Sequence, residues 1–343
     1  MKLSVVILNW NGEDMLRRFL PSVVQYSSME GVEVCVADNC STDNSCSVVE
    51  TEFPSVRLIR LDKNYGFADG YNESLAMLDS EYYVLLNSDV EVTEGWIEPV
   101  IAYMDEHKDV AACQPKILSH SNRNSFDYAG AAGGFIDKYG YPYCRGRVLD
   151  CVEKDNGQYD STISVFWASG AAMFVRASCY KLVGGLDGRF FAHMEEIDLC
   201  WRLQWHKFKL ACVPASKVYH VGGATLKQGN PQKTYLNFRN NLIMLYKNLP
   251  DGEFRRLLCK RRLLDWIAIL VFAIKFDFAN AAAVYRARRD FKRMQPDFIL
   301  SRIETNRMNF SNDAPERSRF SIVIQSKFLL RKTYSVFQKK SLL

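Results

Sequence analysis

The alternation of short apolar segments with segments of helical spacing over the first 113 residues constrains the fold of this chain most strongly. The apolar segments are typical of buried strands, and they cover residues 3–8, 32–37, 56–61, 82–86 and 110–113. Strands separated by helices in this way predict an α/β fold, with a mostly parallel sheet covered by helices on both faces.

Local signals mark the helices between these strands. Asn11 is a candidate cap for the first helix, and Pro21 is expected to kink that helix. Ser41 and Thr42 are candidate caps for the second helix, and a third helix is expected near residues 69–78.

After residue 113 the pattern is less regular. Residues 120–160 are rich in Gly, Ser, Asn, Asp and Tyr, which predicts a long loop or irregular hairpin that is usually functional at this length. A helix is expected through residues 197–205, followed by short closing strands at 210–214 and 218–220. From about residue 235 the pattern is helical. The expected division is therefore residues 1–235, with halves of about 1–115 and 116–235, and a C-terminal extension over 236–343.

The net charge of +5 is distributed unevenly along the 343 residues. Residues 251–343 carry 20 Lys and Arg against 9 Asp and Glu, whereas residues 1–250 carry 24 and 30. A basic and apolar C-terminal region favours contact with an anionic membrane surface, and helices packed on the rest of the chain or on a second subunit are an equal alternative. The apolar run at 266–274 is far shorter than the ~20 residues that span a bilayer.

The ten cysteines are scattered without a CxxC pair. Several of them, including Cys35 and Cys113, lie in apolar runs and are typical of buried thiols in a reducing compartment. The N-terminus shows no signal-peptide pattern. These features favour a cytoplasmic location, with peripheral contact to the inner face of the membrane as an extension. The oligomeric state is not readable, and no nucleic-acid partner is expected.

Polar clusters directly follow three of the expected strands. They are Asn9-Trp10-Asn11-Gly12, Asp38-Asn39 and Asn87-Ser88-Asp89. A single Asp after a strand is usually a turn former. Ligands of open α/β sheets, however, bind at the carboxyl ends of the strands, and three clusters on one rim point to such a site.

These residue types suit a nucleotide sugar. Trp10 offers a flat ring for a base, and Asp38 offers an acceptor for an N–H of a pyrimidine. Asp89 is a hard oxygen ligand for Mg²⁺ or Mn²⁺, which typically binds one or two carboxylates together with phosphates. His220 ends a short strand and is a second candidate metal ligand, although a structural role is the commoner one for such a histidine.

Three carboxylates crowd the start of the helix expected near residue 197. They are Glu195, Glu196 and Asp198. Acids at a helix N-terminus often only complement the helix dipole. Crowded carboxylates also raise one another's pKa, so that one of them can act as a general base toward a sugar hydroxyl. The preceding Gly184-Gly185 pair is a candidate hinge for a lid.

Seven motifs in order resemble the family 2 glycosyltransferases, in particular their bacterial rhamnosyltransferase-like branch. The resemblance covers residues 3 to about 250. The motifs are SVVILNWNG at 4–12, VADNCSTDNS at 36–45, NYGFADGYN at 64–72, LLNSDV at 85–90, WASGAAMFVR at 167–176, GGLDGRFFAHMEEIDLCWR at 184–202 and VYHVGGAT at 218–225.

The resemblance implies a GT-A (Rossmann-like) fold in residues 1–235 and an inverting single displacement. It also implies that Asn9, Trp10, Asp38, Asn64, Gly66 and Asn87 meet the nucleotide sugar. Asp89 and His220 would hold the divalent cation, Mn²⁺ or Mg²⁺. Glu196 would be the base, with Glu195 and Asp198 in support. Residues near the donor or acceptor sugar would be Trp167, Ser169, Gly170, Ala171 and Arg202.

The chain departs from the family pattern at two places. The usual Glu-Asp pair is replaced by Glu195-Glu196, which lengthens the side chain of the expected base by one methylene. The QxxRW signature of processive synthases is absent, because Leu203-Gln204-Trp205 follows Arg202. This second departure favours transfer of a single sugar over polymerisation.

The expected activity is transfer of one sugar from a dTDP- or UDP-sugar, with dTDP-rhamnose as the first guess, to a hydroxyl of a glycan or lipid-linked acceptor in cell-surface polysaccharide synthesis. A non-catalytic sugar-nucleotide-binding or scaffold protein is one alternative. A nucleotidylyltransferase is a weaker one, because residues 9–14 read NWNGED and lack a Gly-rich basic loop for a triphosphate.

Overall fold

The structure is a computed structural model that describes residues 1–222, 229–308, 315, 317–328 and 333–334. The last three residues of the motif at 218–225 lie outside the described residues. Its strands are β1 (Leu3–Asn9), β2 (Val32–Asp38), β3 (Arg57–Arg60), β4 (Tyr82–Asn87), β5 (Val90–Val92), β6 (Val110–Ser119), β7 (Gly134–Ile136), β8 (Pro142–Cys144), β9 (Arg147–Val148), β10 (Cys151–Val152), β11 (Ile163–Ser164), β12 (Ala172–Arg176) and β13 (Lys209–His220).

Its α-helices are α1 (Glu13–Tyr26), α2 (Ser45–Glu52), α3 (Gly66–Ala76), α4 (Glu98–Glu106), α5 (Ala177–Leu182), α6 (Glu195–Trp205), α7 (Pro231–Asn248), α8 (Asp251–Ile274), α9 (Phe278–Met294), α10 (Ile299–Met308) and α11 (Ile322–Phe328). Short 3₁₀ helices cover Gly188–Phe190 and Gln295–Phe298. Strands and helices thus alternate from β1 to β6, as the sequence predicts, except that the short strand β5 follows β4 directly. In the described residues after β13, the elements are helices.

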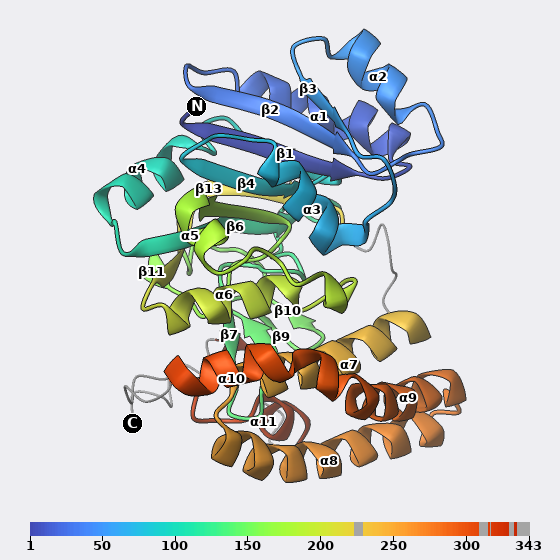
Figure 1. The fold of residues 1–343 in the computed structure, drawn as a ribbon. Helices are drawn as coiled ribbons and strands as arrows, with labels where there is room; N and C mark the ends of the chain where they lie inside the picture. Colours follow the sequence, from blue (N-terminus) through green and yellow to red (C-terminus); the bar gives the residue numbers. More distant parts are fainter. Residues whose placement is uncertain (223–228, 309–314, 316, 329–332, 335–343) are drawn as a thin grey trace.

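The main sheet has the strand order β11-β13-β6-β12-β4-β1-β2-β3, with β5 paired to β13 (Figure 1). The four strands β3, β2, β1 and β4 are parallel neighbours, and β6 is parallel to β13. The strand β12 is antiparallel to both of its neighbours, β4 and β6. The sheet is therefore mostly parallel, which confirms the predicted fold class.

Each face of the sheet has its own apolar core. In β4, Tyr82, Val84 and Leu86 pack with residues of α1 and α4, whereas Tyr83 and Leu85 pack with residues of α3, α5 and α6. Successive side chains of a strand point to opposite faces, and so a strand buried on both sides is apolar throughout. This is why the sequence shows continuous apolar runs at these strands instead of alternation.

Residues 120–160 are more ordered than the sequence suggests. Within the described residues, β7, β8, β9 and β10 form a second antiparallel sheet of two- and three-residue strands. Lys116 of β6 anchors this region: its buried ammonium group binds Asp155 at 2.8 Å and also binds Asp160. The expected long loop or irregular hairpin is therefore a small antiparallel sheet that is held to the main sheet by a buried ion pair.

Several local expectations need correction. Gly12, and not Asn11, precedes α1, which contains Pro21. Asn44 is the residue before α2, so neither Ser41 nor Thr42 caps that helix. The two closing strands are one strand, β13, because a bulge between Val213 and Lys217 lets the pairing with β6 resume after an irregular stretch.

The C-terminal helices α7, α8 and α9 pack against one another below the sheets (Figure 1). The inner face of α8 buries Phe254 and Leu257 together with two charged residues, Arg261 and Asp265. Asp265 pairs with Arg261 at 3.7 Å and also with Arg288 of α9. In the described part of the chain, no helix combines the length and apolar character that a membrane span requires.

Removal of the Asp265 carboxylate should destabilise the protein strongly. The variant Asp265→Ala leaves two arginines, one of them fully buried, without their counter-ion, and breaking such a pair typically costs about 3–5 kcal/mol. Urea denaturation followed by circular dichroism measures the change. The control Glu50→Ala breaks a pair with Arg60 that is about half exposed, and it should change stability little. Equal losses in the two variants would contradict a structural role for the buried pair.

Candidate active site

The three polar clusters that follow the strands meet at one rim of the main sheet. In the register of the sheet Asn9 lies opposite Asp38, and Leu8 lies opposite Asn87. The Asn9 side-chain amide donates a hydrogen bond to Asp38 Oδ1 at 3.1 Å, and both side chains are buried. The second Asp38 oxygen accepts from the Ser41 backbone N–H at 2.9 Å. Asp38 is therefore fixed in place at the end of β2.

A second set of contacts joins this rim to the start of α3. The Asn39 side chain donates to Asn64 Oδ1 at 3.0 Å and to the Gly66 carbonyl at 2.9 Å, and it accepts from the Tyr65 backbone N–H at 2.8 Å. Gly66 has φ +77°, a conformation that favours glycine. Asn64 and Gly66, both predicted to line the donor site, are thus held beside the end of β2.

Trp10 is exposed at this rim, with 56% of its surface accessible. An exposed indole next to two fixed polar groups offers a stacking surface for a planar ligand. Gly12 lies behind it, and a Cβ atom at this position would approach Asn9 Oδ1 to 2.3 Å. The glycine therefore lets the chain turn tightly around Asn9.

Asp89 and His220 are brought together at the same end of the sheet because β5 pairs with β13. His220 Nε2 lies 3.2 Å from Asp89 Oδ1, and His220 Nδ1 lies 3.2 Å from Asp127 Oδ2. Burial alone would lower the pKa of His220, but the hydrogen bonds and negative charges of Asp127 and Asp89 raise it to about 10. Asp127, in the region predicted to be a loop, gave no sequence signal beyond that of a turn former.

This arrangement suits a divalent cation with two protein ligands. Within the described ranges, no group of three or more His, Cys, Asp or Glu side chains is placed to hold a metal ion. A carboxylate and an imidazole are common ligands of Mn²⁺, and phosphate oxygens can complete its coordination. Asp127 occupies the position of the outer carboxylate that typically orients a metal-binding histidine. The residues present therefore fit an ion that arrives with a diphosphate.

Glu195 and Glu196 begin α6, and both are short of partners. Glu195 Oε2 and Glu196 Oε2 are buried atoms without a hydrogen-bond partner among the described residues. Burial, and then the charge of Glu196, raises the pKa of Glu195 well above its ordinary value. Burial likewise raises the pKa of Glu196. Unpaired buried carboxyl oxygens are costly, and they are typical of sites that await a ligand.

The segment before these glutamates has an unusual backbone. Phe191, His193 and Met194 all have positive φ values of 68° to 76°. The side-chain amide of Asn240 in α7 donates to the carbonyls of Phe190, Ala192 and His193 at 2.7 to 2.9 Å. Strained backbone persists where its surroundings hold it, and it is common at functional sites. Asn240, which the sequence did not single out, therefore positions the start of α6.

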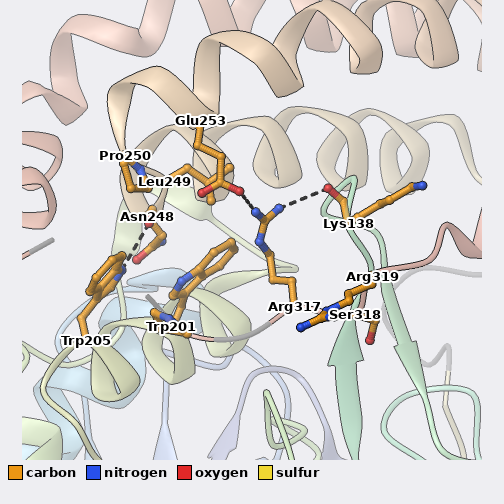
Figure 2. A pocket seen from close by; sticks show the side chains of 11 residues that line it. Lys138, Trp201, Trp205, Asn248, Leu249, Pro250, Glu253, Arg317, Ser318 and Arg319 are labelled. Carbon is orange, nitrogen blue, oxygen red and sulfur yellow. Dashed lines mark hydrogen bonds and ion pairs between the residues drawn. The ribbon is translucent and has the colours of Figure 1, made fainter. Parts of the chain in front are cut away.

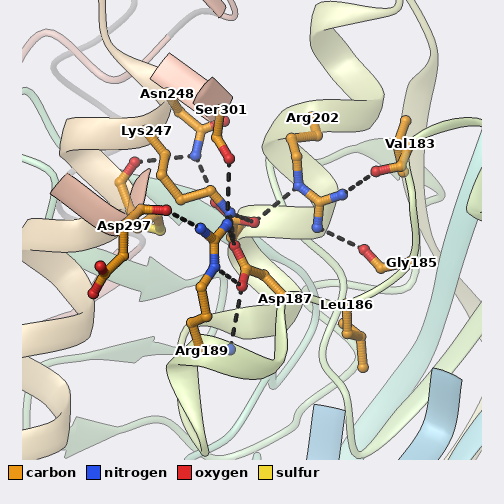
Figure 3. Close-up of polar contacts among 12 residues, drawn as sticks. Val183, Gly185, Leu186, Asp187, Arg189, Arg202, Lys247, Asn248, Asp297 and Ser301 are labelled. Atoms are coloured by element: carbon orange, nitrogen blue, oxygen red, sulfur yellow. Dashed lines mark hydrogen bonds and ion pairs between the residues drawn. The ribbon is translucent and has the colours of Figure 1, made fainter. Parts of the chain in front are cut away.

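Asp198 and Arg202 belong to an ion-pair network that also includes Lys247 and Asp187. Figure 3 shows Arg202, Lys247 and Asp187 of this network. Asp198 is fully buried and binds Arg202 at 2.9 Å, Lys247 at 2.7 Å and Asn248 at 2.7 Å. Lys247 also binds Asp187, whose pKa burial would raise but Arg189 and Lys247 hold far below its usual range. Every described contact of Asp198 is structural, and it ties α6 to α7. The structure does not place Asp198 and Arg202 with the other predicted site residues.

A cavity of about 340 Å³ lies beside Glu196. Its lining residues are Tyr128, Ala129, Tyr141, Pro142, Arg147, Leu149, Asp150, Trp167, Ser169, His193, Met194, Glu196, Ile197, Lys233, Asn237, Phe238, Asn241 and Arg261. Gly170 lies next to Glu196, since a Cβ atom there would be 3.6 Å from Glu196 Cβ. The Ala171 carbonyl accepts from the Asn87 backbone N–H at 3.0 Å, so this segment connects the cavity to the rim of the sheet.

Two further cavities hold none of the predicted nucleotide- or metal-binding residues. One, of about 270 Å³, lies between Trp201 and Trp205 of α6 and the ion pair of Glu253 with Arg317 (Figure 2). The other, of about 440 Å³, borders the Asp187 network. Of these three cavities, the one beside Glu196 joins a carboxyl oxygen that lacks a partner among the described residues to an open volume, which makes it the candidate site for the substrate hydroxyl.

Comparison with known proteins agrees with this geometry. Residues 4–161 match the family described as glycosyl transferase family 2. This part of the chain is a glycosyl transferase family 2 domain, and the protein is a glycosyltransferase.

An N-acetylglucosaminyl-diphospho-decaprenol L-rhamnosyltransferase of Mycobacterium tuberculosis is 27% identical to the glycosyltransferase chain over 236 residues, which cover 64% of this chain and 75% of the relative. A crystal structure of S. aureus TarS residues 1–349 in complex with UDP-GlcNAc superposes with a TM-score of 0.56 at 15% identity, over 90% of this chain and 89% of that one. A crystal structure of GalNAc-T7 with UDP, GalNAc and Mn²⁺ superposes with a TM-score of 0.57 at 13% identity, over 92% of this chain and 58% of that one. The structural likeness confirms the GT-A fold.

Gly134→Ala should disturb the cavity through Trp167. A Cβ atom at residue 134 would lie 2.1 Å from the Trp167 indole, whose position is fixed by a hydrogen bond from Nε1 to the Phe135 carbonyl. Overpacking of this kind typically costs about 1–3 kcal/mol. Urea denaturation should show this loss, and the tryptophan fluorescence should shift. The control Gly252→Ala meets no atom within 4 Å and should keep or raise stability. Wild-type stability and fluorescence in Gly134→Ala would contradict the packing described.

Proposed function

We propose that this glycosyltransferase is an inverting enzyme that transfers a single sugar from a nucleoside-diphosphate sugar to a hydroxyl of a glycan or lipid-linked acceptor. The main support is the unpartnered, buried Oε2 of Glu196 beside a cavity that the segment at Gly170 and Ala171 links to the strand-end rim. A base beside an acceptor cavity and a polar rim for a nucleotide are the two parts that this reaction requires.

The nucleotide would bind at the rim. Trp10 is exposed and suits stacking on the base, and Asp38 is fixed by Asn9 and Ser41 as an acceptor for a base N–H. Asn64 and Gly66 follow Asn39 around the same edge, where the ribose and diphosphate would lie. Asn87, next to Ala171, would then face the donor sugar.

Asp89 and His220 would hold Mn²⁺ or Mg²⁺ at the diphosphate, with Asp127 orienting His220. When bound, such an ion neutralises charge that develops on the departing nucleoside diphosphate. The GalNAc-T7 structure named above contains Mn²⁺, which supports this assignment through the shared fold.

Glu196 would take the proton of the acceptor hydroxyl. The hydroxyl oxygen forms a bond to the anomeric carbon while the bond from that carbon to the diphosphate oxygen breaks on the opposite face, and the proton passes to Glu196 Oε2. A carboxylate whose pKa is raised by burial is a stronger base than one in water, which suits it to this step. Glu195, whose pKa is raised by burial and then by the charge of Glu196, would support the site rather than contact the hydroxyl.

A dTDP- or UDP-sugar is the proposed donor, and dTDP-rhamnose is the first to test because a relative is named as an L-rhamnosyltransferase. That relative's name also places a diphospho-decaprenol acceptor in its reaction, which supports a lipid-linked acceptor here. The proposed setting is cell-surface polysaccharide synthesis on the cytoplasmic side of a membrane. The predicted division into residues 1–235 and 236–343 is kept in this proposal only as a distinction between a catalytic part and a helical C-terminal part, because residue 235 lies within α7.

A non-catalytic sugar-nucleotide-binding protein would keep the rim, but it would have no use for an unpaired buried Glu196. Nucleoside-diphosphate binding without release from any donor and acceptor pair would favour that alternative. A nucleotidylyltransferase is disfavoured by the two acids in residues 9–14.

Glu196→Gln should abolish most transfer while leaving the fold intact. Loss of a general base typically costs about 10²–10⁴-fold in rate. In the wild type, kcat/KM should fall as the pH is lowered through an apparent pKa above 4.5, because the raised pKa of Glu196 lets it protonate earlier than an ordinary carboxyl. Nucleoside-diphosphate release over a panel of donors with Mn²⁺ measures both. The control is Glu94→Gln, an exposed residue outside the site. Full activity in Glu196→Gln would contradict the assignment of Glu196 as the general base.

Asp89→Ala should weaken binding of a nucleoside diphosphate in the presence of Mn²⁺ and change it little without metal. Loss of even an outer partner of a metal ligand typically lowers affinity about 10–100-fold, and loss of a ligand itself should do at least as much. Isothermal titration with UDP and dTDP, with and without Mn²⁺, makes the comparison. Asp109→Ala, which removes an exposed carboxylate paired to Lys209, is the matched control. Unchanged metal dependence in Asp89→Ala would contradict the proposed metal site.

A further inference from the structure

The helix α8 has an inverted distribution of side chains in its second half. Its inner face buries Arg261 and Asp265, whereas six large apolar side chains of the same helix are exposed. They are Leu263, Trp266, Ile267, Leu270, Val271 and Ile274. Phe276 and Phe278, in the turn that leads to α9, are exposed by 82% and 63%. These eight residues are named here the outer face of α8.

Exposure of so many large apolar side chains together is unusual for a protein surface in water. Single exposed apolar residues are common, but a contiguous patch marks a surface that contacts another apolar phase. The α8 helix lies along the edge of the molecule away from the main sheet, so none of the described elements covers this face (Figure 1). An interfacial helix needs such a face and does not need to span the bilayer.

The charges around the outer face of α8 favour an anionic partner. Between Arg255 and Lys275 every exposed charged side chain is a cation, namely Arg255, Arg256, Lys260, Arg262 and Lys275. The single acid in this stretch, Asp265, is fully buried. Anionic lipid headgroups attract such a surface, and each Lys or Arg near the headgroups adds about fivefold to the affinity.

A second copy of the chain is a poorer partner for the same face. A twofold dimer through the outer face of α8 would place one helix on its own copy and bring the like charges of the two chains close together. We therefore propose that the outer face of α8, which includes Phe276 and Phe278, lies in the headgroup region of an anionic lipid bilayer.

This placement sharpens the proposed function, and in this one respect it rests on it. Arg261, on the inner face of α8, lines the cavity beside Glu196 together with Asn241 of α7. A helix with its side chains is about 10 Å across. The cavity would therefore lie about one helix diameter from the headgroups, within reach of the sugar of a lipid-linked acceptor that stays anchored in the membrane.

Co-sedimentation of the full chain with vesicles tests the proposal. Vesicles of phosphatidylcholine alone are compared with vesicles that also contain phosphatidylglycerol, at low and high salt. The wild type should bind the anionic vesicles preferentially, and less at high salt. The triple variant Trp266→Ser, Leu270→Ser, Ile274→Ser should lose at least about tenfold in binding, because burial of apolar surface contributes to interfacial binding. The variant Arg256→Gln, Arg262→Gln should lose binding to anionic vesicles only.

A matched control replaces an exposed apolar residue elsewhere. Met77 at the end of α3 is 51% exposed, and Met77→Ser should bind vesicles as the wild type does. Circular dichroism and thermal unfolding show whether each variant is folded. Because the substituted side chains are exposed, the variants should unfold at the wild-type temperature.

Three results would overturn the proposal. The first is that the folded triple variant binds vesicles as well as the wild type does, and the second is that the wild type binds neutral and anionic vesicles equally. The third is that the wild type binds no vesicles and is a dimer in size-exclusion chromatography, whereas the triple variant is a monomer. A failure of the membrane proposal can be told apart from a failure of the proposed transfer activity. Release of nucleoside diphosphate with a water-soluble acceptor needs no membrane, and it should be the same in the wild type and the triple variant.

Discussion

The parallel register of β1 with β2 and β4 is the constraint on which the site depends. Backbone hydrogen bonding places Asn9 opposite Asp38 and Leu8 opposite Asn87, so three chain segments leave the sheet at one level. Their first polar residues then meet without any long loop to position them. A shift of one residue in this register would turn each strand-end side chain to the opposite face of the sheet. The apolar cores on both faces oppose such a shift, and so the packing of the sheet also fixes the geometry of the rim.

The antiparallel strands bring the second half of the site to this rim. Pairing of β5 with β13 sets His220 opposite Val90, and Asp89 and His220 are therefore neighbours although 131 positions separate them in the sequence. The strand β12 lies between β4 and β6, so the segment at Ser169 to Ala171 enters the sheet beside Asn87. The rim and the cavity are two sides of one piece of backbone, which is the arrangement that a transfer between two bound molecules requires.

The sequence predicted those parts of the site that follow directly from strand ends. Asn9, Asp38 and Asp89 were predicted because an apolar run stops at or just before a polar residue, whereas Asn64 was predicted from the family resemblance. The structure joins Asn9 to Asp38, and Asn39 next to it joins Asn64. The sequence could not predict Asp127, whose role exists only because β13 places His220 beside it. The small sheet after residue 133 was predicted only as a long loop or irregular hairpin, for a related reason. Its strands have two or three residues, too few to show a period, and they form through contacts that are distant in sequence.

Asp198 shows where residue type alone misleads. It stands two positions from Glu196, and on a helix two positions turn a side chain to nearly the opposite face. Glu196 therefore borders the cavity while Asp198 meets Lys247 and Asn248 of α7. The three acids at the start of α6 differ in their contacts: Asp198 holds the helix in place, whereas Glu195 and Glu196 each keep one buried carboxyl oxygen without a hydrogen-bond partner among the described residues. The spacing of two residues along the helix thus separates Asp198 from Glu196, although the two carboxylates are close in the sequence.

The C-terminal helices take part in the site rather than only extending the chain. Asn240 of α7 holds the strained segment from Phe190 to His193, and positive φ values at ordinary residues cost about 1–3 kcal/mol each. Lys247 of α7 neutralises Asp187 and Asp198 on either side of that segment. The expected boundary after residue 235 falls inside α7, so a chain cut there would lose both residues. Because α7 packs on both α6 and α9, packing contacts connect the C-terminal helices to the helix that begins with the two glutamates.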